Sequence, residues 1–113
     1  MMIKIKRVYA EPDAEDGYRI LIDRLWPRGI SKDKAKIEMW MKEVAPSDEL
    51  RKWFSHDPEK WNEFRGKYEA ELKNKSEHIG KIRAMEKKEK VVTLLYATKD
   101  SEHNNAVALR DFI

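Results

Sequence analysis

The segment that decides the fold is residues 19–29, which have the sequence RILIDRLWPRG. The three consecutive branched aliphatic residues at 20–22 indicate a strand covered on both faces, as in the middle of an α/β sheet. We predict this strand over residues 18–25. Pro27 removes a backbone donor and disfavours a central strand, while Gly29 permits the positive φ of a tight turn. The segment therefore predicts a buried strand that ends abruptly in a turn.

A second apolar run, residues 91–97 with the sequence VVTLLYA, predicts another central strand. Because it is apolar on both faces, we expect it to lie parallel to its neighbour. The helical region 47–89 is then the right-handed crossover between the two strands. Residues 98–101 are predicted to form the turn after this strand, and residues near 102–112 the last helix.

The remaining segments continue an α/β pattern. Residues 2–9 alternate in polarity and predict a half-exposed strand at or near a sheet edge. Helices are predicted to start at Ser47, at Asp57-Pro58 and at Ser76, because Ser and Asp cap helices and Pro suits the first helical position. The helix after Pro58 carries an apolar stripe at helical spacing: Trp61, Phe64, Tyr68 and Leu72.

Residues 32–44 fit two periodicities. Ile37, Met39 and Met41 alternate with polar neighbours as in a strand, whereas Ile37, Trp40, Met41 and Val44 would share one face of a helix. We favour an extended segment that ends at Ala45-Pro46. Together, these segments predict a single α/β domain over residues 1–113, with a small, mainly parallel sheet and packed helices.

Composition excludes several classes of protein. The chain has 113 residues, a formal net charge of +3 and no cysteine, so it has no disulfide, thiolate zinc site or cysteine nucleophile. The balance of charge argues against a strongly basic nucleic-acid-binding module. No apolar run is long enough to cross a membrane, and residues 1–6 do not resemble a signal peptide, so we expect a cytoplasmic protein with no membrane partner.

Charged and polar side chains gather where the two central strands end. In open α/β sheets, ligands bind outside the carboxyl ends of the strands, and arginine offers a planar fork that matches a phosphate or a carboxylate. We therefore predict a pocket for a small anionic ligand, such as a nucleotide or a phosphometabolite. The predicted binding residues are Arg24, Trp26, Arg28, Tyr96, Lys99, Asn104 and Asn105. Asp23 and Asp100 are candidates for a catalytic base, and whether the protein is an enzyme stays open.

Other interpretations fit the same residues. Asp23 and Arg24 can form an ion pair at the rim, and Asp100 can simply cap the last helix. The two turns can belong to a non-catalytic module that docks a protein or a nucleic-acid backbone, although the charge balance does not favour nucleic acid. Trp40 and Trp53 can face a partner subunit, and the oligomeric state stays open. No cofactor and no metal are predicted, because the histidines lack metal-ligand spacing: His56, His78 and His103.

Long motifs along nearly the whole chain suggest a family. They are IDRLWPRG at 22–29, Trp40, APS at 45–47, LRKWF at 50–54, HDP at 56–58, TLLYA at 93–97, KD at 99–100 and NNA at 104–106. With these motifs the chain resembles the YeaO-like proteins, which belong to the domain of unknown function 488 family. The resemblance implies a functional edge at both turns, but the family has no established activity.

The resemblance also shows where this chain departs from longer relatives. Those proteins carry an Asp-x-Arg-x-x-Pro block after the corresponding strand, and a Cys-His-Arg triplet at the start of the last helix. This chain has Asp23-Arg24 and Pro27 in the first place, and either His103-Asn104-Asn105 or Asn104-Asn105-Ala106 in the second. Because no cysteine is present, a thiol mechanism of such a relative could not operate here.

Overall fold

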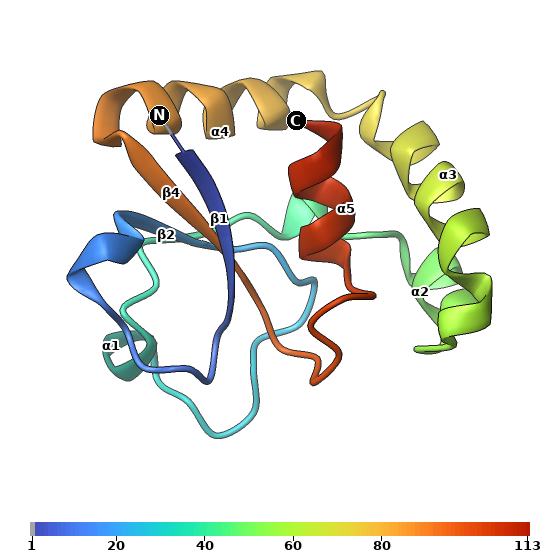
Figure 1. Cartoon of the computed structure of the whole chain (residues 1–113), viewed down its shortest axis with the longest axis horizontal. Coiled ribbons are helices and arrows are strands. Elements are labelled where there is room, and N and C mark those ends of the chain that lie inside the picture. The colour runs from blue at the N-terminus through green and yellow to red at the C-terminus, as the bar shows by residue number, and fades with distance from the viewer. Residues whose placement is uncertain (1) are drawn as a thin grey trace.

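The structure is a computed structural model that describes residues 2–113. These residues form a four-stranded sheet in the order β1-β4-β2-β3, and every pair of neighbouring strands is parallel. The strands are β1 (Met2–Arg7), β2 (Tyr18–Leu21), β3 (Met39–Trp40) and β4 (Val91–Tyr96), and Figure 1 labels β1, β2 and β4. The predicted single α/β domain is confirmed. The predicted edge position of β1 and the central position of β4 are also confirmed.

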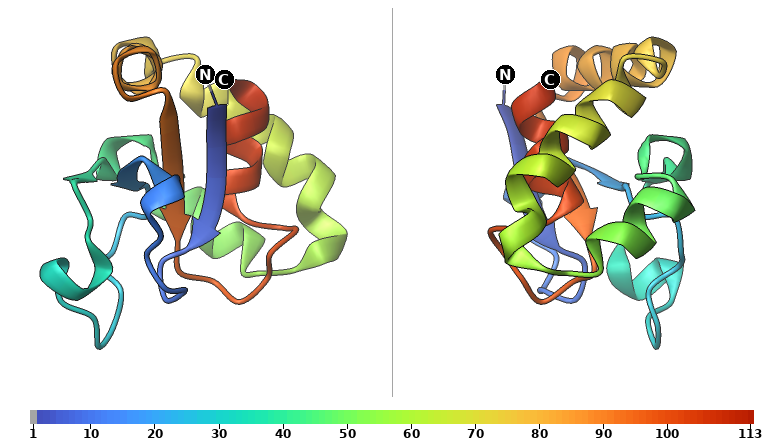
Figure 2. Two further views of the ribbon diagram at one scale, coloured as in Figure 1. Left: turned by 60° about the vertical axis from the view of Figure 1, so that its left-hand side comes forward. Right: turned by 90° about the vertical axis from the view of Figure 1, so that its right-hand side faces the viewer.

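Five α-helices surround the sheet. They are α1 (Lys32–Ala35), α2 (Asp48–Phe54), α3 (Trp61–Leu72), α4 (Ser76–Glu89) and α5 (Asn105–Phe112). Three short 3-10 helices complete the chain: η1 (Ala14–Asp16), η2 (Lys42–Val44) and η3 (Pro58–Lys60). Figure 2 shows α3 and α5 on one side of the sheet and α1 on the other. Within residues 2–113, the helices are too short or too polar to cross a membrane.

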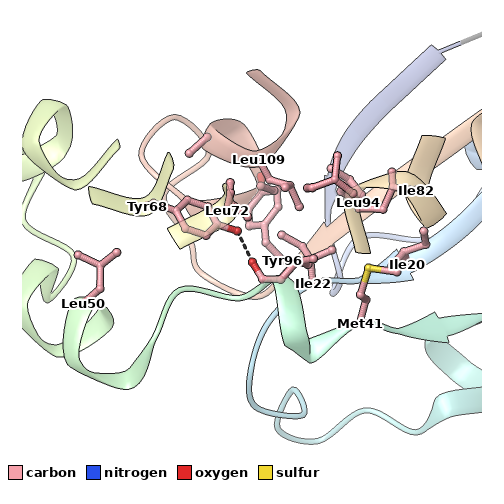
Figure 3. Close-up of a cluster of buried hydrophobic side chains, with 14 of the residues drawn as sticks. Ile20, Ile22, Met41, Leu50, Tyr68, Leu72, Ile82, Leu94, Tyr96 and Leu109 are labelled. Carbon is pink, nitrogen blue, oxygen red and sulfur yellow. Dashed lines mark hydrogen bonds between the residues drawn. The ribbon is translucent and has the colours of Figure 1, made fainter. Parts of the chain in front are cut away.

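The larger core lies between the sheet and helices α3 to α5. Ile20, Ile22, Leu94 and Tyr96 are buried on this side and pack with helical residues that include Tyr68, Leu72, Ile82 and Leu109 (Figure 3). The hydroxyl group of Tyr68 donates to the backbone carbonyl of Val44. A smaller cluster covers the other face of the sheet and consists of Val8, Leu21, Ala35, Ile37 and Leu95. Both faces of β2 and β4 are therefore buried, as the apolar runs predict.

Strand β2 ends at Leu21, earlier than the predicted Leu25. The N–H group of Ile22 still donates to the carbonyl of Leu95, at 3.2 Å. The next residue, Asp23, bonds to β4 through its side chain instead: its Oδ2 accepts the N–H group of Ala97 at 2.9 Å. The backbone is thereby free to turn away from the sheet, which explains the short strand.

Residues 32–44 are neither one strand nor one helix, so the favoured extended segment is correct only around β3. Ser31 accepts the N–H group of Lys34 and starts the single turn of α1, which Lys36 ends in a left-handed conformation with φ of 49°. The two residues of β3 then pair with β2, and η2 follows. Each element is too short to impose its own periodicity on the sequence.

The predicted helix starts are partly correct. Ser47 caps α2 by accepting the N–H group of Leu50. Asp57 caps η3, and the α-helix begins only at Trp61. Ser76 is the first residue of α4, but its side chain makes no capping bond, so that part of the prediction is wrong. The last helix begins at Asn105 rather than near residue 102, because the residue before it, Asn104, is extended and serves as the N-cap.

A buried ion pair ties the loop before β2 to α1. Asp16 and Arg19 are each only 3% exposed, and Nη1 of Arg19 lies 2.5 Å from Oδ2 of Asp16. The same guanidinium donates through Nε and Nη2 to the carbonyl of Ala35, at 3.1 and 2.8 Å. Lys6 adds a second contact to Asp16 at 3.1 Å. Four elements of the fold, η1, β1, β2 and α1, therefore meet at one charge cluster.

Gly17 occupies a position that only glycine can fill. Its φ is 64°, and a Cβ atom there would lie 2.3 Å from the carbonyl oxygen of Val91. We expect Gly17→Ala to lower the free energy of unfolding by more than about 1 kcal/mol, through strain and collision. Gly66→Ala is the matched control, because this site in α3 is open and alanine should stabilise it by about 0.5–1 kcal/mol. Urea denaturation measures the free energy of unfolding of both variants. An equal effect of the two substitutions would contradict the special role of Gly17.

Candidate functional site

The ends of β2 and β4 lie side by side at one edge of the sheet. The two strands are parallel neighbours, with Leu21 opposite Leu95, which confirms the prediction that the two turns meet. Asp23 connects the turns: its Oδ2 accepts the N–H group of Ala97, and its Oδ1 accepts Nδ2 of Asn105 at 3.0 Å. The start of α5 is thereby held against the end of β2.

A cavity of about 390 Å³ opens at this edge. Residues 23–28 after β2 form one wall, Ala97, Thr98 and residues 103–105 after β4 form another, and α2 with the residues around it forms a third. The apolar part of the lining consists of Leu25, Trp26, Pro27, Ala45, Pro46, Phe54, Phe64 and Ala97, with Tyr9 at the edge. The cavity is therefore large enough for a metabolite, since small-molecule pockets usually have volumes of about 300–1,000 Å³.

Three arginines line the cavity. Arg24 donates through Nε and Nη2 to the carbonyl of Pro46, both at 3.3 Å, and its Nε lies 3.8 Å from Asp48. Arg51 reaches the same carboxylate at 3.2 Å. Arg28 is exposed and pairs with no carboxylate among residues 2–113. Because Asp48 is the shared partner of two arginines and the third has none, positive charge is in excess at this edge.

Asp23 is the carboxylate that lines the cavity. Burial raises the pKa of Asp23. The hydrogen bonds from Asn105 and Ala97 and the nearby His56 act in the opposite direction but do not outweigh burial. The alternative of a rim ion pair between Asp23 and Arg24 is wrong, because Arg24 extends toward Pro46 while Asp23 extends toward β4 and α5. The backbone carbonyl of Asp23 also accepts Nε1 of Trp40 at 2.7 Å, which fixes the turn from outside.

The turn after β4 is organised by Asp100. Its Oδ1 accepts the N–H groups of Glu102 and His103 at 2.9 and 3.0 Å, and these bonds lower its pKa. The ring of His103 lies against the same carboxylate, with Nδ1 at 3.0 Å from Oδ2. Asn104 then caps α5 by accepting the N–H group of Val107. Because Asn104 is itself extended, with φ of −138° and ψ of 166°, the helix begins only at Asn105.

The structure brings most of the predicted site residues together. Asp23, Arg24, Trp26, Arg28, Asn104 and Asn105 line the cavity. Lys99 is exposed, Tyr96 is buried in the main core, and neither is part of the lining. Asp100 is also outside the lining, where it holds the turn. Trp26 uses its Nε1 for the carbonyl of Ile30 at 2.8 Å and packs edge-on against Trp40, so it shapes the wall.

Four lining residues with ionisable side chains are absent from the predicted set: Tyr9, Arg51, His56 and His103. Arg51 and His56 belong to the crossover and lie in motif blocks that carry the family resemblance. Those blocks are the feature of the sequence that could have identified the two residues as part of the site. The chain turns sharply after α2, since Ser55 and His56 both have positive φ, 46° and 57°, and this turn places His56 at the cavity. Within residues 2–113 no three His, Asp or Glu side chains gather as metal ligands.

The fold and the cavity define the class of protein: a small parallel α/β domain with a charged pocket at the carboxyl edge of its sheet. Residues 2–113 match the family model described as "Inactive DUF488-N3 subclade", and the chain belongs to the DUF488 family. The uncharacterized protein YeaO of Escherichia coli (strain K12) is 45% identical over 113 residues, which cover 100% of this chain and 97% of that protein. The uncharacterized protein Rv3073c of Mycobacterium tuberculosis (strain ATCC 25618 / H37Rv) is 39% identical over 111 residues, or 98% and 92% of the two chains. No solved structure matches the chain.

Proposed function

We propose that this protein binds a small anionic ligand, bearing a phosphate or a carboxylate, in the cavity at the ends of β2 and β4. The observation that carries the proposal is the lining itself, in which three arginines face one carboxylate. Guanidinium groups recognise phosphate and carboxylate oxygens with paired hydrogen bonds. Arg28 is the strongest candidate for first contact, because it pairs with no carboxylate among the described residues.

The apolar part of the lining supports a ligand that has an apolar or aromatic part in addition to its anionic group. Trp26, Pro27 and Phe54 line the same cavity as the arginines, and apolar walls with a few placed polar groups are typical of metabolite pockets. A nucleotide or a phosphometabolite has both parts. This class of ligand is therefore the one that we propose.

The proposal concerns binding and includes no reaction. The family model that the chain matches is described as inactive. Of the two candidate bases, Asp100 is engaged by the backbone of its own turn, and Asp23 is engaged by Ala97 and Asn105. The alternative of a module that docks a protein or a nucleic acid stays a prediction. Its test is saturable binding of oligonucleotides with a steep dependence on salt.

Arg28→Ala tests the proposed function directly. We expect the wild type to bind adenosine 5′-monophosphate, and the variant to bind it more weakly by about 1.5–3 kcal/mol, the value of a hydrogen bond to a charged group. Isothermal titration calorimetry measures both affinities. Arg110→Ala is the matched control, because Arg110 is an exposed arginine of α5 outside the cavity lining. An equal loss of affinity in both variants would contradict the proposal. It would also be contradicted if the wild type showed no saturable binding of the nucleotide, of ethyl phosphate or of inorganic phosphate.

A further inference from the structure

The cavity contains a carboxylate whose presence an anionic ligand does not explain. Asp23 lines the same space as the three arginines, and a like charge there would weaken the binding of a simple anion. Many pockets neutralise such a carboxylate with an ion pair, yet Asp23 pairs with no Lys, Arg or His side chain among residues 2–113. The two bonds by which Asp23 joins the turns need oxygen acceptors but no negative charge, so this structural role does not account for the charge.

The contacts of Asp23 leave part of its hydrogen-bonding capacity unused. Oδ2 accepts one bond from the N–H group of Ala97, and Oδ1 accepts one from Nδ2 of Asn105. Both donors are neutral, and an ionised carboxylate can accept about four bonds. Burial raises its pKa, so a cationic or strongly donating group placed beside it would relieve an unfavourable state.

The side chains of neighbouring residues keep the two signs of charge apart. Asp23 extends toward β4 and α5, whereas Arg24 extends toward Pro46 and the carboxylate at the start of α2. Arg51 lies on α2 itself and shares that carboxylate, Asp48. The lining thus has an acidic side next to α5 and a basic side next to α2, and the two do not neutralise each other.

We propose that Asp23 determines specificity, and that the ligand carries, besides its anionic group, a nitrogen donor that binds the Asp23 carboxylate. This inference rests on the proposed function and names the ligand class more closely. The donor is either an ammonium group or the adjacent N–H groups of a base such as guanine. The anionic group lies at the arginines and the donor lies at Asp23.

Matched pairs of ligands test the inference on the wild-type protein by calorimetry. O-phosphoethanolamine and ethyl phosphate differ by one ammonium group, and guanosine 5′-monophosphate differs from purine riboside 5′-monophosphate by the N–H donors and the carbonyl group of guanine. We expect the donor-bearing member of one pair to bind about tenfold more tightly or better, as for a hydrogen bond to a charged group. The pair that shows the preference identifies the source of the donor.

Asp23→Asn then separates charge from shape. The asparagine oxygen can accept the N–H group of Ala97, and its amide can donate to Asn105 after that side chain flips, so both bonds of residue 23 survive, at the cost of the 3.4 Å bond from Nδ2 of Asn105 to the carbonyl of Ile22. We expect this variant to lose the preference within the pair, while ethyl phosphate binds as tightly as before or more tightly. Asp33→Asn, at an exposed carboxylate of α1 outside the cavity lining, should leave all four affinities unchanged.

The outcomes are distinguishable. If ethyl phosphate binds but neither pair shows a preference, the inference about Asp23 fails and the proposed function stands. If none of the four ligands binds, both fail together. If Asp23→Asn does not fold, as judged by circular dichroism, the absence of a preference in both ligand pairs on the wild type still overturns the inference. A preference that persists undiminished in a folded variant assigns the donor to another group and overturns the inference.

Discussion

Arg19→Met is expected to lower the free energy of unfolding by about 3–5 kcal/mol, the usual cost of breaking a buried ion pair by removing one partner. Arg19 is 3% exposed, and its guanidinium contacts both the carboxylate of Asp16 and the carbonyl of Ala35. Methionine fills much of the same space, so the loss reports on charge and hydrogen bonds rather than on a cavity. Urea denaturation followed by circular dichroism measures it.

Arg65→Met is the matched control for this change. Arg65 forms an ion pair with Asp111 at 3.1 Å, but both side chains are more than one-third exposed, so its loss should cost less than about 1 kcal/mol. A similar, small loss in both variants would show that the buried pair contributes no more than an exposed one. In that case the charge cluster would not be what holds α1 on the sheet.

Acid provides a second measurement of the same cluster. Burial alone would raise the pKa of Asp16, but the N–H group of Asp13, Lys6 and Arg19 outweigh it and lower the pKa below 3.8. A carboxylate with a lowered pKa in the folded state contributes stability that is fully present above its unfolded pKa, and the contribution is lost as the pH falls through the folded value. We expect the wild type to lose stability below about pH 4, and Arg19→Met to lose less over the same range.

Tyr68→Ala is expected to cost about 3–5 kcal/mol, as for other large aromatic residues removed from a core. Tyr68 is fully buried, packs against Phe64 at a tilt with ring centroids 5.7 Å apart, and donates its hydroxyl to the carbonyl of Val44. Thermal and urea denaturation measure the loss. A cost below about 2 kcal/mol would mean that the core collapses onto the vacated space, and would contradict the expectation.

Tyr68→Phe separates the hydroxyl group from the ring. It keeps the packing and leaves the carbonyl of Val44 without its partner, which should cost about 1–3 kcal/mol. This bond links α3 to η2, the last element before α2. The difference in the free energy of unfolding between the two variants therefore separates the contribution of this polar contact from that of the packed ring.

The sheet could be predicted from the sequence because its central strands are apolar on both faces. Residues 91–97 and 20–22 contain almost no polar side chain. In a domain of this size, such a run is best buried as a central strand with both faces covered. Residues 32–44 could not be predicted in the same way. The turn of α1 is stabilised from outside, by the guanidinium of Arg19 on the carbonyl of Ala35, and no local periodicity records such a contact.

The site could be predicted only where its residues follow a central strand. Arg24 and Arg28 come after β2 and line the cavity as expected. Arg51 lies on the crossover, and its position depends on long-range packing, with Phe54 stacked on Phe64 at 4.3 Å and Glu71 bound to Ser47. Lys99 was placed in the predicted site because of its charge, but it lies exposed outside the lining.

The order of the strands has a consequence for biosynthesis. Strand β4 lies between β1 and β2, and Met2 pairs with Val91 across almost the whole length of the chain. A growing chain on the ribosome therefore holds β1 and β2 without their common partner until residues 91–96 have been made. Contacts so distant in sequence close slowly, and translation adds only about 5–20 residues per second. The four-stranded sheet can consequently be completed only late, and a chain released before Val91 would have no strand to join β1 to β2.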